Sequence, residues 1–120
     1  MFGNVFKDKK VLVTGNTGFK GSWLSLWLNK LGADVYGLSN GVTTNPSMFT
    51  ELEIHNKIKY FEKDIRDLDS VVKIVQEVKP DFVFHLAAQA IVVESYKNPV
   101  ETMASNVMGT CHVLEALRLN

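Results

Sequence analysis

Three glycines, each three residues from the next, lie in the segment Thr14-Gly15-Asn16-Thr17-Gly18-Phe19-Lys20-Gly21. The first position permits a tight turn, the second lets the backbone approach a pyrophosphate, and the third lets a helix pack closely on a sheet. The spacing is G-x-x-G-x-x-G and not the G-x-G-x-x-G of the dinucleotide fingerprint. A merely flexible turn is the alternative, but a predicted strand precedes the glycines and a predicted helix follows them. The segment therefore predicts a phosphate-binding turn made of Gly15, Asn16, Thr17, Gly18, Phe19, Lys20 and Gly21.

A dinucleotide site also needs a partner for the adenosine ribose about 20 residues further on, where Ser39 and Asn40 stand. Neither is a carboxylate that could accept from both ribose hydroxyls, and neither is a cation that could pair with a 2′-phosphate. The lack of a cation in this segment favours NAD over NADP.

Two later segments also suit cofactor binding. Asp64 follows a predicted strand, where its carboxylate can accept a hydrogen bond from an adenine amino group, while Asp67 is interpreted as a helix N-cap. Ala87 and Ala88, followed by Gln89, end another predicted strand and leave room for a planar ring and its ribose. His85, inside that strand, is interpreted as a buried and hydrogen-bonded imidazole and not as a base.

Apolar periodicity predicts the elements that would bring these segments together. Strands are predicted at residues 11–14, 34–38, 58–62 and 82–88, and helices at 21–31, 68–79 and from 99 onward. The last strand is almost continuously apolar, as in a strand covered on both faces. The order predicts an α/β fold of the Rossmann type, a mostly parallel sheet with flanking helices and the strand order third, second, first, fourth.

The predicted core includes Trp23 and Trp27 on the first helix. On the last helix the residues expected to face inward, with Cys111 buried and inert, are Val100, Met103, Val107, Cys111, Leu114 and Leu117. No Cys/His cluster has zinc-ligand spacing, and the aspartates after residue 63 lack the glycine and distal glutamate of a calcium loop. No metal is expected.

The composition is that of one folded domain: 120 residues, 46% of them hydrophobic. The 13 Lys and Arg residues balance 13 Asp and Glu residues, which argues against nucleic acid and anionic membranes as partners. A single cysteine excludes an internal disulfide, and neither a signal-peptide core nor a membrane-spanning run is present. A cytoplasmic location is the expectation.

The chain resembles the extended short-chain dehydrogenase/reductase family that acts on nucleotide sugars. Four motifs carry the resemblance: Thr14-Gly15-x-x-Gly18-Phe19-x-Gly21, Asp64-Ile65-Arg66-Asp67, His85-Leu86-Ala87-Ala88 and Ser105-Asn106-Val107-x-Gly109-Thr110. Within the family, residues 18–24, 44–49 and 87–89 are most similar to its 4,6-dehydratases.

The resemblance implies bound NAD, held by the glycine turn and by residues at the strand ends. Asp64 and Ile65 would lie at the adenine, Ser39 near the ribose, Ser105 near the cofactor, and Leu86, Ala87, Ala88 and Gln89 along the ribose and nicotinamide. It also implies a nucleotide-sugar substrate, with CDP-glucose favoured, and a homo-oligomeric parent protein. The implied reaction is transient oxidation at C4 by NAD, elimination of water across C5 and C6, and return of the hydride to C6.

Three departures from the family pattern stand out. Asn16 replaces a frequent histidine, and Val93-Glu94 replace a pair that usually includes an arginine, which removes positive charge on the sugar-nucleotide side. The catalytic Tyr-x-x-x-Lys is missing, since the residues four after the three tyrosines are Asn40, Asp64 and Val100.

Residues 1–120 are therefore expected to be the N-terminal NAD-binding portion of an incomplete Rossmann fold, without a catalytic residue or the substrate-binding part. Alone, the chain is expected to be inactive and to self-associate through the strand at residues 82–88. Two alternatives stay open: the NAD-binding part of another nucleotide-sugar epimerase or reductase, and a non-catalytic dinucleotide-binding module.

Overall fold

Four parallel strands form the centre of the computed structural model, which describes all 120 residues. They are β1 (Lys10–Thr14), β2 (Asp34–Ser39), β3 (Lys59–Glu62) and β4 (Phe82–His85), in the order β3-β2-β1-β4. Val13 of β1 pairs with Gly37 of β2 and with Phe84 of β4. The predicted strand order and Rossmann-type class are confirmed.

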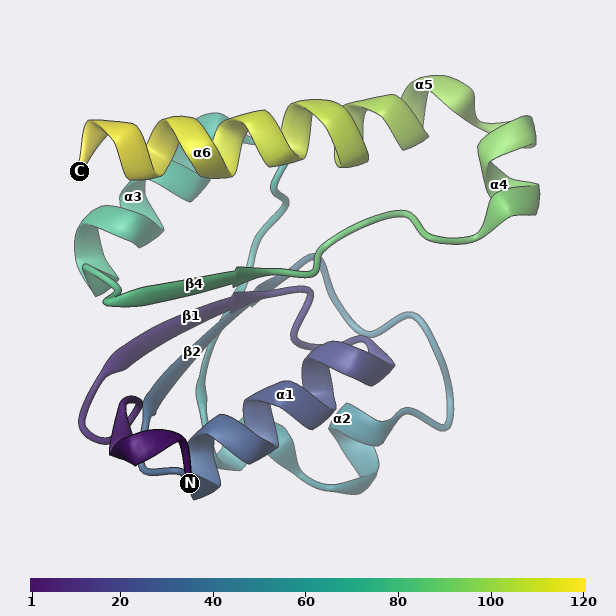
Figure 1. Ribbon diagram of the computed structural model, residues 1–120. Helices are drawn as coiled ribbons and strands as arrows, with labels where there is room; N and C mark the ends of the chain where they lie inside the picture. Colours follow the sequence, from purple (N-terminus) through teal and green to yellow (C-terminus); the bar gives the residue numbers. More distant parts are fainter.

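Helices cover both faces of this sheet (Figure 1). One face carries α1 (Phe19–Lys30), α2 (Met48–Glu51) and the short 3-10 turn Ile54–Asn56, and the other carries α3 (Leu68–Val78) and α6 (Gly109–Leu119). A further 3-10 turn, Phe2–Asn4, begins the chain, while α4 (Val92–Lys97), α5 (Pro99–Met103) and the π-helical segment Ala104–Met108 connect β4 to α6. No helix combines the length and the apolar character that crossing a membrane requires.

Two apolar cores result, one on each side of the sheet. Leu12 and Leu38 point into the core beneath α3 and α6, while Val11, Val13 and Val35 point into the core beneath α1. This alternation follows from the period of two residues along a strand.

The inward face of α1 differs from the predicted one. Trp23 and Trp27 are 54% and 46% exposed, so the prediction that they belong to the core is wrong. The buried positions of α1 are Gly21, Ser22, Ser25 and Leu28. Small side chains lie against the sheet because they allow the helix axis to approach it closely, and the large indole rings must then point outward.

The last helix also turns a different face inward. Val100, Met103, Val107 and Leu114 are exposed, and so is Cys111, which was expected to be buried. The buried positions of α6 are instead Gly109, Val113 and Ala116, and Leu117 is partly buried against the same core. As on α1, small residues occupy the contact because α6 packs closely on its neighbours.

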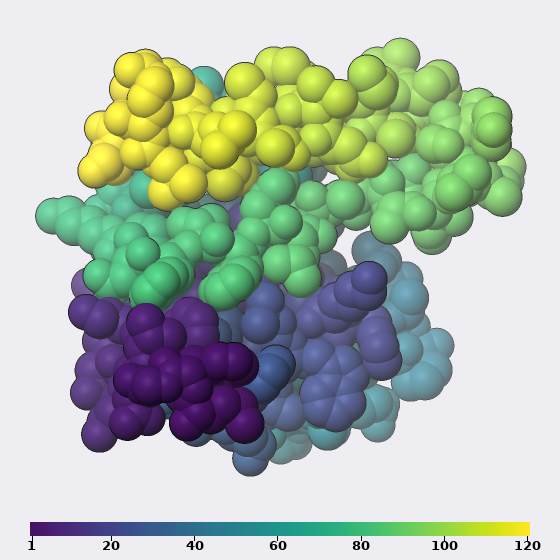
Figure 2. All heavy atoms as spheres, in the orientation of Figure 1, coloured from purple at the N-terminus to yellow at the C-terminus, as the bar shows by residue number.

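The fourth strand is shorter than predicted. β4 pairs only with β1 and therefore lies at the edge of the sheet, with each of its residues half-buried. Residues 86–91 leave the sheet beyond it and run toward α4, where Figure 2 shows the surface hollowed between this green segment and the blue segment below. Strand ends and helices thus meet around one concave region.

Candidate dinucleotide-binding site

The glycine turn joins β1 to α1 with backbone groups free to bind a ligand. Gly15 has φ of +73°, and a Cβ there would lie 2.7 Å from the Ala87 nitrogen, so the turn requires glycine at this position. No side chain caps α1, which begins after Gly18. The N–H groups of residues 19–21 have no hydrogen-bond partner within the chain. Free N–H groups at the start of a helix favour an anion such as a pyrophosphate.

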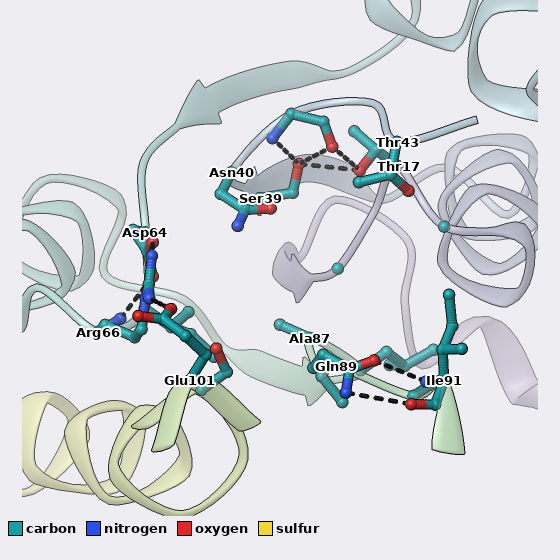
Figure 3. Close-up of a pocket in the computed structure, with 18 of the residues that line it drawn as sticks. Thr17, Ser39, Asn40, Thr43, Asp64, Arg66, Ala87, Gln89, Ile91 and Glu101 are labelled. Atoms are coloured by element: carbon teal, nitrogen blue, oxygen red, sulfur yellow. Dashed lines mark hydrogen bonds and ion pairs between the residues drawn. The ribbon is translucent and has the colours of Figure 1, made fainter. Parts of the chain in front are cut away.

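A cavity of about 510 Å³ opens at the carboxyl ends of the strands, a size that suits a small-molecule ligand. This is the edge at which open parallel sheets bind ligands. Four strand ends and three helical segments line it: Gly15, Thr17, Gly18, Ser39, Asn40, Gly41, Thr43, Lys63, Asp64, Ile65, Arg66, Leu86, Ala87, Ala88, Gln89, Ala90, Ile91, Glu94, Glu101 and Ser105. Figure 3 shows Asp64, Arg66 and Glu101 together at one end of the cavity, with Gln89 and Ile91 at another.

Most residues predicted to contact the cofactor line this cavity, and four do not. Phe19 and Lys20 are exposed beside it, whereas Gly21 is buried against the turn. Asn16 is fully buried behind the turn, and neither its Oδ1 nor its Nδ2 has a hydrogen-bond partner. The assignment of any of these residues to cofactor binding stays a prediction.

Ser39 belongs to the wall of the cavity as a buried hydroxyl. Its Oγ lies 2.9 Å from Thr17 Oγ1 and 2.9 Å from the Tyr60 hydroxyl, and it accepts a hydrogen bond from the Gly41 nitrogen at 3.2 Å. These contacts engage the Ser39 hydroxyl within the chain, whereas its neighbour Asn40 is exposed and also lines the cavity. A contact between Ser39 and the ribose stays a prediction.

Two cations, Lys63 and Arg66, line the cavity although the segment at residues 39–40 has none. Arg66 donates to Asp64 through Nη2 at 2.7 Å and Nε at 2.9 Å, and its Nη1 pairs with Glu101. These hydrogen bonds from Arg66 hold the pKa of Asp64 below its usual value. The sequence analysis did not identify Lys63 as a residue of the site. Lys63 follows β3, and its place at the cavity arises because β2 and β3 end side by side.

Asn106 holds the segment that follows β4. Its Oδ1 accepts from the Gln89 nitrogen at 2.8 Å, and its Nδ2 donates to the Gln89 carbonyl at 3.0 Å. Asn106 lies in the π-helical segment, a rare geometry that often occurs at functional sites. Its neighbour Ser105 lines the cavity, and the contact of Ser105 with the cofactor stays a prediction. Asn106 belongs to one of the motifs of the resemblance, but its hydrogen bonds to Gln89 were not predicted from the sequence.

A chain of hydrogen bonds connects β1, β4 and α6 through His85. Thr14 Oγ1 accepts from the nitrogens of residues 86–87 and lies 2.6 Å from His85 Nδ1. His85 Nε2 lies 2.9 Å from Thr110 Oγ1, whose hydroxyl donates to the Asn106 carbonyl at 2.7 Å. Since the Thr110 hydrogen is already used, Nε2 must donate, and Nδ1 accepts from Thr14. His85 is therefore a neutral, hydrogen-bonded imidazole, as interpreted from the sequence, but it is half-buried and not fully buried.

Burial lowers the pKa of His85, which makes the stability depend on pH. An unfolded histidine takes up its proton near pH 6.5, whereas the folded one does so only at lower pH, so stability is lost as the pH falls below about 6.5. We expect the free energy of unfolding to fall more between about pH 7.5 and about pH 5.5 in the wild type than in His85→Asn, which cannot titrate there. Urea denaturation across this range measures it, and parallel pH profiles would contradict it.

Comparison with known proteins places this site in a family context. The family model described as GDP-mannose 4,6 dehydratase matches residues 12–120. A CDP-glucose 4,6-dehydratase of Salmonella typhimurium is 46% identical over 115 residues, which are 96% of this chain and 32% of that protein. A GDP-mannose 4,6-dehydratase of Yersinia enterocolitica is 32% identical over 118 residues, 93% of this chain and 32% of that protein. The chain thus spans about a third of the length of these relatives.

Solved structures agree with these sequence matches. An epimerase of Methanothermobacter thermautotrophicus superposes with a TM-score of 0.83 at 34% identity, covering 97% of this chain and 33% of that one. The UDP-glucose 4-epimerase of Thermus thermophilus, solved in complex with NAD, superposes with a TM-score of 0.80 at 36% identity, covering 92% of this chain and 34% of that one.

Proposed function

We propose that this chain, which belongs to the GDP-mannose 4,6 dehydratase family of extended short-chain dehydrogenases/reductases, is the NAD-binding part of a nucleotide-sugar 4,6-dehydratase. The observation that carries the proposal is the meeting of the glycine turn and the ends of four parallel strands in one cavity. CDP-glucose is the proposed substrate, because the CDP-glucose enzyme is 46% identical and the Yersinia GDP-mannose enzyme is 32% identical.

The residues of the cavity suit the parts of a dinucleotide. The free N–H groups of residues 19–21, which lie beside the cavity at the start of α1, would bind the pyrophosphate. Asp64 and Ile65 would meet the adenine, and residues 86–89 would lie along the ribose and nicotinamide. When bound, NAD would supply a reversible acceptor for the sugar hydride. The role of the chain itself would be to bind and orient NAD. It contains no Tyr-x-x-x-Lys to take a proton from the sugar.

Two further proposals concern activity and assembly. The 120-residue chain alone has no dehydratase activity, because it lacks that base. The whole protein is a homo-oligomer, and the exposed apolar side chains of Val100, Met103, Val107 and Leu114 support this by offering a surface for a second copy to cover.

A nucleotide-sugar epimerase is the second candidate, because several similar solved structures are UDP-glucose 4-epimerases. An assay of the full-length protein separates the two functions. A dehydratase should convert CDP-glucose to a 4-keto-6-deoxy sugar, while an epimerase should give only the C4 epimer.

We expect the full-length protein to bind NAD more tightly than NADP. The cavity holds the carboxylates of Asp64, Glu94 and Glu101 against the cations of Lys63 and Arg66, and two of the carboxylates already engage Arg66. An added 2′-phosphate dianion would therefore meet net negative charge. Calorimetric titration with both cofactors measures the preference. Tighter NADP binding that is lost in Lys63→Ala would contradict it and identify the responsible cation.

A further inference from the structure

Helix α6 contacts Ile65, the residue between Asp64 and Arg66, at two points. His112 Nδ1 lies 2.8 Å from the Ile65 carbonyl oxygen, in a partly buried contact between residues 47 positions apart. One turn earlier on the helix, a Cβ added at Gly109 would overlap the end of the Ile65 side chain. Ile65 is 6% exposed and its side chain packs against α6 at Gly109, while the residue also contributes to the lining of the cavity.

The backbone groups around Ile65 are almost all engaged. In the peptide before it, the Asp64 carbonyl accepts from the Asp67 nitrogen at 3.0 Å. In the peptide after it, the Arg66 nitrogen donates to Asp64 Oδ1 at 2.9 Å, and the carbonyl accepts from His112. Only the Ile65 N–H has no partner in the chain. The contact from His112 therefore fixes the peptide plane adjoining a free donor at the cavity wall.

This free N–H stands beside a carboxylate that accepts hydrogen bonds. Asp64 is an ionised carboxylate whose pKa is lowered by the hydrogen bonds from Arg66. Its Oδ2 already accepts from both Nε and Nη2 of Arg66, whereas its Oδ1 accepts only from the Arg66 backbone nitrogen and retains acceptor capacity. A donor next to an acceptor matches the edge of adenine, which offers a ring-nitrogen acceptor next to an amino donor.

We propose that His112 is a positioning residue for the adenine end of the site, acting through the Ile65 carbonyl; this rests on the proposed function. His112 does not line the cavity, so its effect on a ligand must pass through the backbone of Ile65. Neither the glycine turn nor the segment after β4 hydrogen-bonds to His112.

The test compares two substitutions in the full-length protein. His112→Leu removes the donor, whereas His112→Asn retains an N–H at the same number of bonds from the backbone. We expect His112→Leu to weaken NAD binding about three- to tenfold, the range of one lost hydrogen bond, and His112→Asn to bind like the wild type. Calorimetry with NAD, with nicotinamide hypoxanthine dinucleotide and with nicotinamide mononucleotide gives the affinities.

The two additional ligands separate positioning from general damage. Hypoxanthine exchanges the donor and the acceptor on the base edge, so His112→Leu should lower the preference for NAD over this analogue, and binding of the mononucleotide should not change. Equal weakening for all three ligands, or an unchanged preference, would overturn the role of His112. If His112→Leu does not fold, loss of the preference in a folded His112→Asn would overturn it as well. Failure of the wild type to bind NAD would instead overturn the proposed function, and this inference with it.

Discussion

Gly18→Val in the full-length protein is expected to keep the fold and to weaken the affinity for NAD about a hundredfold or more. That change corresponds to roughly 3 kcal/mol of binding free energy. A Cβ at Gly18 would meet only the Gly15 carbonyl oxygen, at an ordinary 3.5 Å, so the chain has room for the side chain. The backbone at Gly18, with φ of −74° and ψ of 171°, is extended and suits valine. The added methyl groups would stand beside the free N–H groups that begin α1, where the pyrophosphate is proposed to bind.

Calorimetric titration with NAD and a thermal unfolding curve measure the two halves of this expectation. Lys30→Val is the matched control, because Lys30 is an exposed residue in the last turn of the same helix and does not line the cavity. It should bind NAD like the wild type. A folded Gly18→Val protein with unchanged affinity would remove the glycine turn from the site.

The sheet could be predicted from the sequence because strands carry a strong local signal. The apolar run at residues 11–14 and the glycines after it placed β1 and the turn, and the alternation of strands and helices gave the order β3-β2-β1-β4. The inward faces of α1 and α6 could not be predicted by hydrophobicity. Both contacts are made by residues such as Gly21, Ser25 and Ala116, whose small size matters more than their apolar character.

The candidate site shows the same division between local and tertiary information. The glycine turn, Asp64 and Ala87 could be found because each directly follows a strand, and strand ends converge in a parallel sheet. Glu101 and His112 contact residues 35 and 47 positions away, and no local pattern marks such partners. The occupied hydroxyl of Ser39 is also a tertiary effect, since Tyr60 reaches it from the adjacent strand.

Gly21→Ala is expected to destabilise the fold by roughly 3 kcal/mol, although alanine favours a helix over glycine by about 1 kcal/mol. A Cβ at Gly21 would overlap the Gly15 carbonyl oxygen and lie 2.8 Å from the Gly15 carbonyl carbon and 2.9 Å from Asn16 Cα. All three are backbone atoms of the turn. The turn cannot move away from α1, because Gly15 packs against the backbone of Leu86 and Ala87. Helix α1 would therefore have to move off the sheet.

Gly109→Ala is the matched control, because it makes the same change in another helix with the same gain in helix preference. There the new Cβ would overlap atoms of the Ile65 side chain and no backbone atom, so a side chain and not the turn would have to shift. We expect Gly109→Ala to change the free energy of unfolding by about 1 kcal/mol or less, and urea denaturation of both variants measures the difference. Equal losses would mean that the close contact between turn and helix is no more rigid than a side-chain contact. A larger loss for Gly21→Ala would show that packing requires the third glycine, independently of any ligand. Helix α1 can hold its free N–H groups beside the cavity only if it lies against the turn.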